Sequence, residues 1–138
     1  MNGIAEERRR FAWERVRFWG QETATRIQSL PIEIRTQGLS MTVAILLRED
    51  RRPSRDLLDL LETWLFEASP MRVLPTPRER EKLGTRRGHV LLDTLLSLDL
   101  NQQRAYASAQ QDAMALLGEA KLLASARFPS EVHSGDSH

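Results

Sequence analysis

One stretch in the first half of the chain, Ser29–Leu47, restricts the possible folds more than any other. Pro31 has no backbone N–H and a fixed φ, so it suits the first turn of a short helix. Gly38 can end that helix in a left-handed conformation, which is open to a residue without Cβ. Apolar side chains then recur at helical spacing at Leu39, Val43, Leu46 and Leu47. We therefore expect a tight elbow over Leu30–Gly38, followed by a buried central helix on which the rest of the chain packs.

The proline-free segment before the elbow predicts one long helix from Ile4 to Leu30. Its apolar residues fall on one narrow arc of a helical projection: Ala5, Ala12, Val16, Trp19, Ile27 and Leu30. Phe11 and Phe18 lie one heptad apart on the flank of this arc, among arginines. Such residues can stack on nucleic-acid bases, but aromatics at helical spacing more often pack against another helix. We favour packing for both.

Three more helical segments follow the central helix. The first begins at Pro53 and reaches about Ala68, and the charged residues predicted to face outward on it are Asp56, Asp59 and Glu62. A short buried helix covers Leu91–Leu98, and a final helix runs from about Leu100 to Phe128, where Pro129 ends it. The predicted fold is all-α: a compact bundle of about five to six helices with a long first and a long last helix. Residues 1–128 form a single domain in this prediction, and residues 129–138 form a disordered tail.

The segment between these helices is rich in proline and basic residues. Ser69–Pro77 contains three prolines and predicts a surface loop, after which Thr76–Glu79 has the order of a capping box. The basic residues concentrate here against only two glutamates: Arg72, Arg78, Arg80, Lys82, Arg86, Arg87 and His89. This window can close over RNA phosphates or be a mobile, solvated loop, and its position favours neither reading.

Charge and cysteine content exclude several functions. The formal net charge is only +1, so any nucleic-acid binding has to come from local clusters of basic residues. The chain has no cysteine, hence no disulfide and no thiolate chemistry, which fits a cytoplasmic protein. The apolar run Met41–Leu47 is far shorter than the roughly 18 residues of a membrane span, and charged residues occupy the N-terminus where a signal peptide needs apolar ones. We expect no membrane association.

Catalytic chemistry finds little support. The only bases of near-neutral pKa are His89, His133 and His138, and two of these three lie in the predicted tail. His89 with Asp93, or the carboxylates after Pro53, have spacings that a metal site can use, but solvated helix faces produce such spacings routinely. The chain has no glycine-rich phosphate loop and no Gly-x-Ser-x-Gly elbow. We expect no catalytic residue, no metal and no cofactor.

Two stretches resemble the small helical subunit of the type III-B CRISPR effector, the Cmr complex. The first is the elbow Leu30–Leu39, with Ala12 and Val16 similar to that family's first-helix pattern and Trp64–Leu65 to its later Trp-Leu pair. The second runs from Tyr106 through Asp112–Ala113 to Lys121 and Ala124, similar to the family's closing helix. Where that helix usually has a Trp-Leu-Lys-Arg run, this chain has Glu119–Leu122, so only the lysine carries over.

The resemblance implies a non-catalytic protein that stacks in several copies with the other effector subunits and lines the channel for the guide RNA/target RNA duplex. Such a surface needs basic side chains at intervals on a rigid helical wall and no base-specific contact. The residues expected to contact RNA are Arg35, Arg48, Arg51, Arg52, Arg55 and Lys121, with Arg8, Arg15 and Arg17 in a second group.

Two other functions remain open from the sequence. A homo-oligomeric helical adaptor that binds proteins and no nucleic acid would use the same elbow and the same alanine-rich last helix. A DNA-binding regulator would use Arg48–Leu65 as a turn and recognition helix, although the leucine and aspartate content of that segment suits burial better than a DNA groove.

Overall fold

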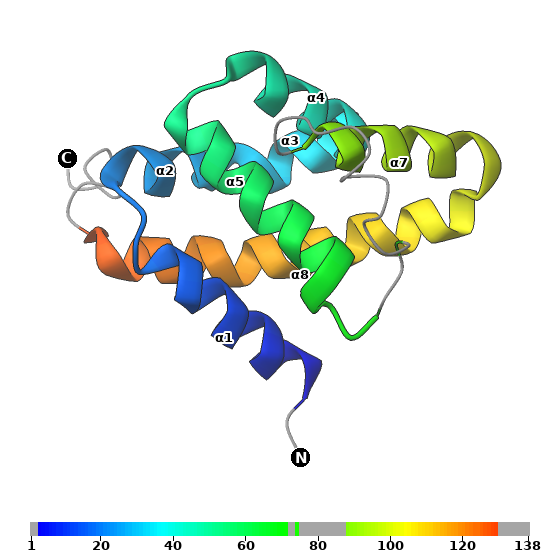
Figure 1. The fold of residues 1–138 in the computed structure, drawn as a ribbon. Helices are drawn as coiled ribbons and strands as arrows, with labels where there is room; N and C mark the ends of the chain where they lie inside the picture. Colours follow the sequence, from blue (N-terminus) through cyan, green and yellow to red (C-terminus); the bar gives the residue numbers. More distant parts are fainter. Residues whose placement is uncertain (1–2, 72–73, 75–87, 130–138) are drawn as a thin grey trace.

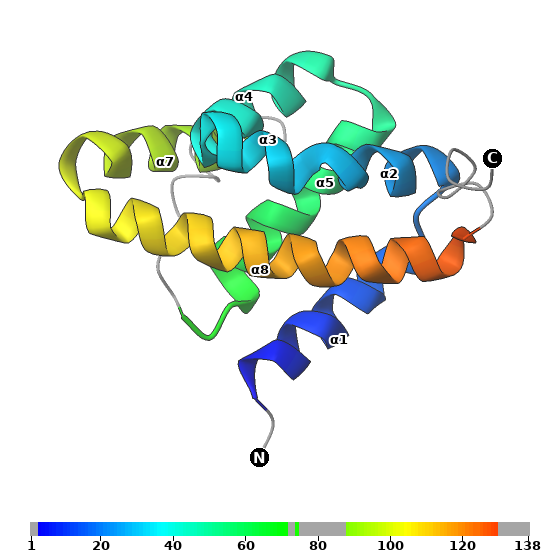
Figure 2. The same ribbon diagram turned by 180° about the vertical axis from the view of Figure 1, so that it is seen from behind.

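The last helix is the axis of the fold. In the computed structural model, which describes residues 3–71, 74 and 88–129, α8 (Gln103–Arg127) runs the length of the molecule. α2, η1 and α3 lie beside it, and α5 crosses both on the face shown in Figure 1. α1 packs on α8 near one end and extends to the side away from α2 and α3 (Figures 1 and 2). The other elements are α1 (Ile4–Val16), α2 (Gln21–Arg26), η1 (Ile27–Ser29), α3 (Leu30–Gln37), α4 (Leu39–Glu49), α5 (Arg52–Thr63), the π-helical turn η2 (Trp64–Ala68) and α7 (His89–Asn101). The predicted all-α bundle is confirmed.

The prediction of one continuous helix from Ile4 to Leu30 was wrong, because α1 ends at Val16. Phe18 N–H and Trp19 N–H donate to the carbonyls three residues earlier, and Gly20 is extended before α2 begins. The turn lets Trp19 enter the core, where it is 6% exposed. The guanidinium of Arg127, from the end of α8, donates to the carbonyl oxygens of Val16 and Trp19 at 2.8 and 2.6 Å. This long-range contact satisfies carbonyls that a continuing helix would have used.

The elbow is confirmed, and α8 holds it in place. Gly38 joins α3 to α4 with a φ of 91° and a ψ of 161°, a conformation that few residues other than glycine adopt. The first N–H groups of α4 are capped by α8: Leu39 N–H donates to Gln110 Oε1 at 2.9 Å and Ser40 N–H to Tyr106 Oη at 3.0 Å. Tyr106 was noted in the sequence only because it belongs to the stretch that resembles the family's closing helix. In the structure it therefore has a structural role at the elbow.

Helix α5 begins one residue before the predicted Pro53 and ends at Thr63, and the π-helical turn η2 carries the helical segment to the predicted Ala68. The prediction that Glu62 faces outward was wrong. Glu62 is fully buried and accepts a hydrogen bond from Gly88 N–H at 2.8 Å. Gly88, with a φ of 99°, packs against Leu47 and Leu58 so closely that an added Cβ would lie 2.9 Å from a Leu58 methyl. The buried carboxylate thus fixes the start of α7 over the α4–α5 pair.

The remaining boundaries shift by a few residues. α7 extends from His89 to Asn101 rather than over Leu91–Leu98, and α8 begins at Gln103 rather than Leu100. The predicted capping box at Thr76–Glu79, most of the basic window Arg72–His89 and the tail after Pro129 lie outside the described residues. No helix in the described part of the chain is long and apolar enough to cross a membrane.

Candidate nucleic-acid interface

The corner between α4 and α5 gathers three exposed arginines. Arg48 lies in the last turn of α4, Arg51 directly precedes α5, and Arg52 is its first residue. None of the three forms an ion pair with another described residue, so their charges face solvent. Exposed guanidinium groups at a rigid corner can donate to phosphate oxygens in the planar, two-point geometry that arginine favours.

Local sequence explains the corner. Asp50 adopts a left-handed conformation with a φ of 46° and a ψ of 48°, which ends α4 and turns the chain. Ser54 then closes the start of α5: its hydroxyl accepts from Arg51 N–H at 3.0 Å and donates to the Arg51 carbonyl at 2.9 Å. Pro53 is buried in the first turn, where a missing N–H costs nothing. These contacts leave the arginine side chains pointing outward from a well-held backbone.

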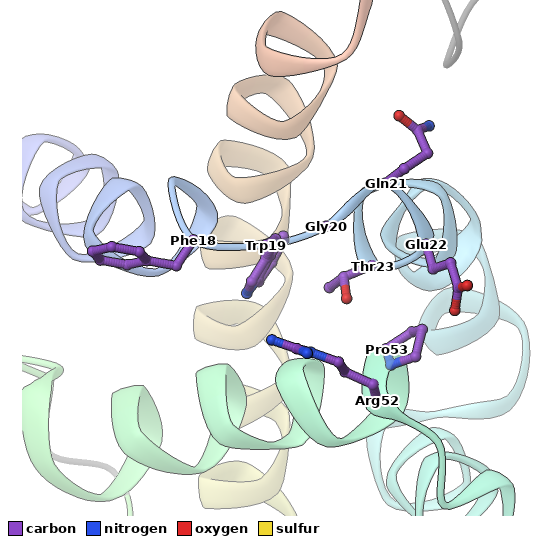
Figure 3. A pocket seen from close by; sticks show the side chains of 8 residues that line it. All are labelled: Phe18, Trp19, Gly20, Gln21, Glu22, Thr23, Arg52 and Pro53. Carbon is purple, nitrogen blue, oxygen red and sulfur yellow. The ribbon is translucent and has the colours of Figure 1, made fainter.

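A groove of about 450 Å³ lies between this corner and the turn that follows α1 (Figure 3). Its lining combines aromatic, polar and charged groups: Phe18, Trp19, Gly20, Gln21, Glu22, Thr23, Arg52 and Pro53. Figure 3 shows Trp19 and Arg52 pointing toward each other from opposite sides, with the indole nitrogen on the Arg52 side. Glu22 lies at the other end, beside Pro53, whereas the Phe18 ring lies beyond Trp19 and points away from the gap between Trp19 and Arg52.

A second hollow continues from the first and shares Gln21, Glu22 and Pro53 with it, while adding Arg26 and Arg51. Arg26 is engaged within the protein: Nη1 donates to Glu33 at 2.6 Å and Nη2 to Glu49 at 3.0 Å. The hydrogen bond from Arg26 holds the pKa of Glu33 below its ordinary value, against the effect of partial burial. Arg26 therefore ties α2, α3 and α4 together, and Arg51 is the cation of this hollow that faces solvent.

The two phenylalanines on the flank of the first predicted helix behave differently. Phe11 packs as predicted, with its ring centroid 5.1 Å from that of Trp64 and the Arg15 guanidinium 4.0 Å from its centre. Phe18, in contrast, is 72% exposed, so the prediction of packing was wrong for this residue. Among the described residues, the Phe18 ring contacts the guanidinium of Arg17, which lies 4.7 Å from the ring centre. Because the helix ends at Val16, Phe18 lies in the turn and no helix face covers it.

The structure separates the other candidates. Arg8 is half-buried and donates from Nε and Nη2 to the buried carboxylate of Asp112 at 3.3 Å. Arg55 pairs with Asp50 at 3.2 Å but stays exposed at the same corner. Arg35 is exposed on α3, and Lys121 is half-buried on α8; neither lines the groove. The structure thus brings Arg48, Arg51, Arg52 and Arg55 to one corner, and Arg17 lies against the ring of Phe18, a residue that lines the neighbouring groove.

Of the eight residues that line the groove, only Arg52 was expected to contact RNA; stacking of Phe18 on a base was considered but packing was favoured, and Trp19 and Thr23 were not considered as site residues. The signal that could have found them is Gly20, because a glycine directly after two aromatics weakens a helix and marks a turn. Among the described residues, no group of three or more His, Asp or Glu side chains is placed to hold a metal ion.

Comparison with known families gives one result. The model of the family described as CRISPR-associated protein (Cas_Cmr5) matches residues 4–127, which is most of the chain. No curated protein and no solved structure matches the chain in the corresponding searches.

Proposed function

The chain belongs to the Cas_Cmr5 family, the small subunit of the type III-B CRISPR complex, and from this premise we propose that it lines the RNA channel of that complex. In this proposal it contacts the backbone of the guide RNA/target RNA duplex and cleaves nothing. Base pairing supplies the sequence specificity of such an effector, so its helical wall needs only phosphate contacts. The family places the protein with other effector subunits in antiviral defence.

The observation that carries the RNA contact is the α4–α5 corner. Arg48, Arg51 and Arg52 are exposed there and form no ion pair within the described residues. In a chain with a formal charge of only +1, such a cluster is the local excess of positive charge that phosphate binding requires. The backbone on both sides is held by the Ser54 hydrogen bonds, so the arginines are presented by a rigid element.

The nine candidate cations fall into three groups in this proposal. Arg48, Arg51 and Arg52 at the α4–α5 corner and Arg17 beside Phe18 make the main contacts. Arg35, Arg55 and Lys121 are accessible but lie apart or have a partner. Arg8 and Arg15 are held by groups inside the protein, Asp112 and Phe11 respectively, so we expect the smallest effect on RNA binding from them.

Several copies of the chain stack along the RNA in this proposal, and exposed apolar residues support protein contacts. Trp13 on α1 is 41% exposed and Leu122 on α8 is 65% exposed, and a shallow hollow of about 390 Å³ lies beside Trp13 and Leu123. On α7, Leu96 and Leu100 are exposed one turn apart. The same surfaces also support the alternative, a homo-oligomeric adaptor without nucleic-acid binding.

Measured RNA binding separates the two functions. The full chain, alone and with its partner subunits, is titrated with guide-paired RNA at increasing salt. We expect the logarithm of the binding constant to fall linearly with the logarithm of salt concentration, because each arginine–phosphate contact releases counterions. Replacing Arg48, Arg51 and Arg52 together by Gln is expected to reduce that slope by about 2 to 3. Arg104→Gln, an exposed arginine on α8 outside the corner, serves as the matched control.

Two results would contradict the proposal. If no RNA binds at low salt, even with partner subunits present, while the protein still self-associates, the adaptor function replaces the RNA function. If intact RNA is cut by the purified chain, and a substitution within the chain abolishes the cutting, the protein is catalytic.

A further inference from the structure

Phe18 is the most exposed aromatic residue that the structure describes. It is 72% exposed, whereas the tryptophan beside it is 6% exposed. The ring lines the groove at the α1–α2 turn, and the Arg17 guanidinium lies 4.7 Å from its centre. A flat apolar surface next to a cation has the composition of a stacking platform for a nucleobase.

The groove beside Phe18 offers donors and a positive charge. The Arg52 guanidinium and the indole N–H side of Trp19 face each other across it, and the Thr23 hydroxyl lies on the same wall (Figure 3). Thr23 donates to Asp56 at 2.7 Å, so its oxygen retains acceptor capacity only. The acidic Glu22 lies at the far end, beside Pro53. Arg52 and the Trp19 indole N–H are therefore the groups of this groove that can donate to a ligand's acceptors, while the Asp56 carboxylate is occupied by the Thr23 hydroxyl.

We infer that this groove binds one unpaired RNA nucleotide, with its base on Phe18 and its phosphate or base carbonyl oxygens on Arg52 and the Trp19 N–H. The inference rests on the proposed RNA function and extends it from phosphate contacts to an unstacked base. A base inside a duplex is covered on both faces by its neighbours, so only an unpaired nucleotide can use the Phe18 ring. The volume of about 450 Å³ lies in the range of small-ligand sites.

The base contribution is measured with two RNA probes that differ only in the bases. One is a short fluorescein-labelled oligouridylate, and the other has the same ribose-phosphate backbone with abasic sites. Fluorescence anisotropy at low salt gives the dissociation constant of each probe for the full chain. We expect about tenfold weaker binding of the abasic probe, because stacking on an aromatic side chain contributes roughly that factor or more per base.

Single variants test which residue gives the preference for the probe that carries bases. Phe18→Leu keeps an apolar side chain but removes the ring, and is expected to bind both probes equally, at the level of the abasic probe. Phe18→Tyr keeps the ring and is expected to keep the preference. Trp13→Leu removes a partly exposed ring outside the groove and is the matched control, with no expected change. Arg52→Gln is expected to weaken binding of both probes.

Each other outcome overturns the inference in a distinct way. If Phe18→Leu keeps the wild-type preference while Arg52→Gln weakens binding, the stacked base is wrong and the phosphate contacts of the proposed function stand. If Phe18→Leu binds RNA as the wild type does but no longer enters the complex with its partner subunits, the groove holds protein. If the wild type binds neither probe, alone or with its partner subunits, the inference and the proposed function both fail.

Discussion

Arg127 closes the end of the first helix from the opposite end of the chain. Its Nη1 donates to the Trp19 carbonyl oxygen at 2.6 Å and to the neighbouring Val16 carbonyl, so the last turn of α8 caps the C-terminus of α1. The contact decides where α1 stops and how Trp19 and Phe18 are presented. The groove therefore depends on a residue more than one hundred positions away in the sequence.

Arg127→Gln should destabilise the fold and loosen the α1–α2 turn. The variant loses a charged donor to two carbonyls, and we expect a loss of about 1 to 2 kcal/mol in the free energy of unfolding. Urea unfolding followed by circular dichroism measures it. Arg104→Gln, an arginine exposed at the other end of α8, should change stability by less than about 0.5 kcal/mol. Equal stability of the two variants would show that the cap contributes nothing.

Arg8→Ala should reduce stability rather than RNA affinity. Asp112 is 3% exposed, and it accepts from Arg8 on α1 and from the Ser69 hydroxyl at 2.5 Å, at the end of η2. Removing Arg8 leaves a buried carboxylate with less compensation, at an expected cost of about 2 to 3 kcal/mol. Thermal unfolding and anisotropy on the same sample separate the two effects.

The double variant Arg8→Ala, Asp112→Ala controls for this argument. If the pair is coupled, the double variant should be less destabilised than the sum of the two single variants. Strict additivity would show that Arg8 and Asp112 are not coupled. A large loss of RNA affinity in Arg8→Ala at unchanged stability would show that Arg8 acts at the RNA surface.

The network around Arg26 predicts a dependence of stability on pH. The hydrogen bond from Arg26 lowers the pKa of Glu33 below its ordinary value of 4.5, so the folded state binds this proton less readily than the unfolded state. The stabilisation from Glu33 is therefore complete above about pH 4.5 and is lost as the pH falls through the lowered folded-state value. Glu33→Gln should be less stable than the wild type at neutral pH, and the difference should shrink in acid.

Urea unfolding of both proteins from neutral pH to acid measures this difference. Glu22→Gln, at an exposed glutamate of α2, is the control and should parallel the wild type at every pH. If the difference in unfolding free energy between the wild type and Glu33→Gln stays constant through the acid range, Glu33 does not lose a favourable charge interaction on protonation.

Replacing glycine by alanine should change the stability in opposite directions at two positions, Gly38 and Gly118. Gly38→Ala forces a Cβ into a backbone conformation that is nearly exclusive to glycine and to within 3.3 Å of Tyr106 Oη, with an expected loss of about 1 to 3 kcal/mol. Gly118 lies in α8 with open space around its Cα, so Gly118→Ala should stabilise the protein by about 0.5 to 1 kcal/mol. Unfolding midpoints of the two variants should therefore move apart on either side of the wild type.

The elements and most of the core followed from local pattern. Pro31 and Gly38 predicted the elbow, and the apolar spacing after Gly38 predicted the buried helix α4, because both signals act within one or two helical turns. Pro53 and the proline that follows Ser69 predicted where the segment formed by α5 and η2 begins and ends, although the π-helical form of its last turn was not predicted. Such features depend on each residue's own backbone preferences, and the tertiary packing is compatible with them.

Features that depend on a distant partner were not predictable in the same way. Glu62 has the spacing of a solvated carboxylate, yet it is buried because the N–H of Gly88 meets it there. Asp112 lies within a long helix whose sequence does not indicate that one of its charged residues is buried. Its burial depends on α1, which brings Arg8 against it. In both cases the partner is far along the chain, and the neighbouring sequence does not distinguish a buried carboxylate from a solvent-exposed one.

The candidate site likewise has one part that the sequence predicted and one part that depends on the tertiary structure. The sequence alone determined that arginines concentrate between α4 and α5, because charge and turn chemistry are properties of adjacent residues. Gly20 marks a turn after the two aromatics, but it was the tertiary structure that decided that α1 stops at Val16, that Phe18 stays exposed and that Trp19 faces Arg52. The physical reason is that a helix end is a balance of small local terms, and here the packing of Trp19 and two hydrogen bonds from Arg127 determine it.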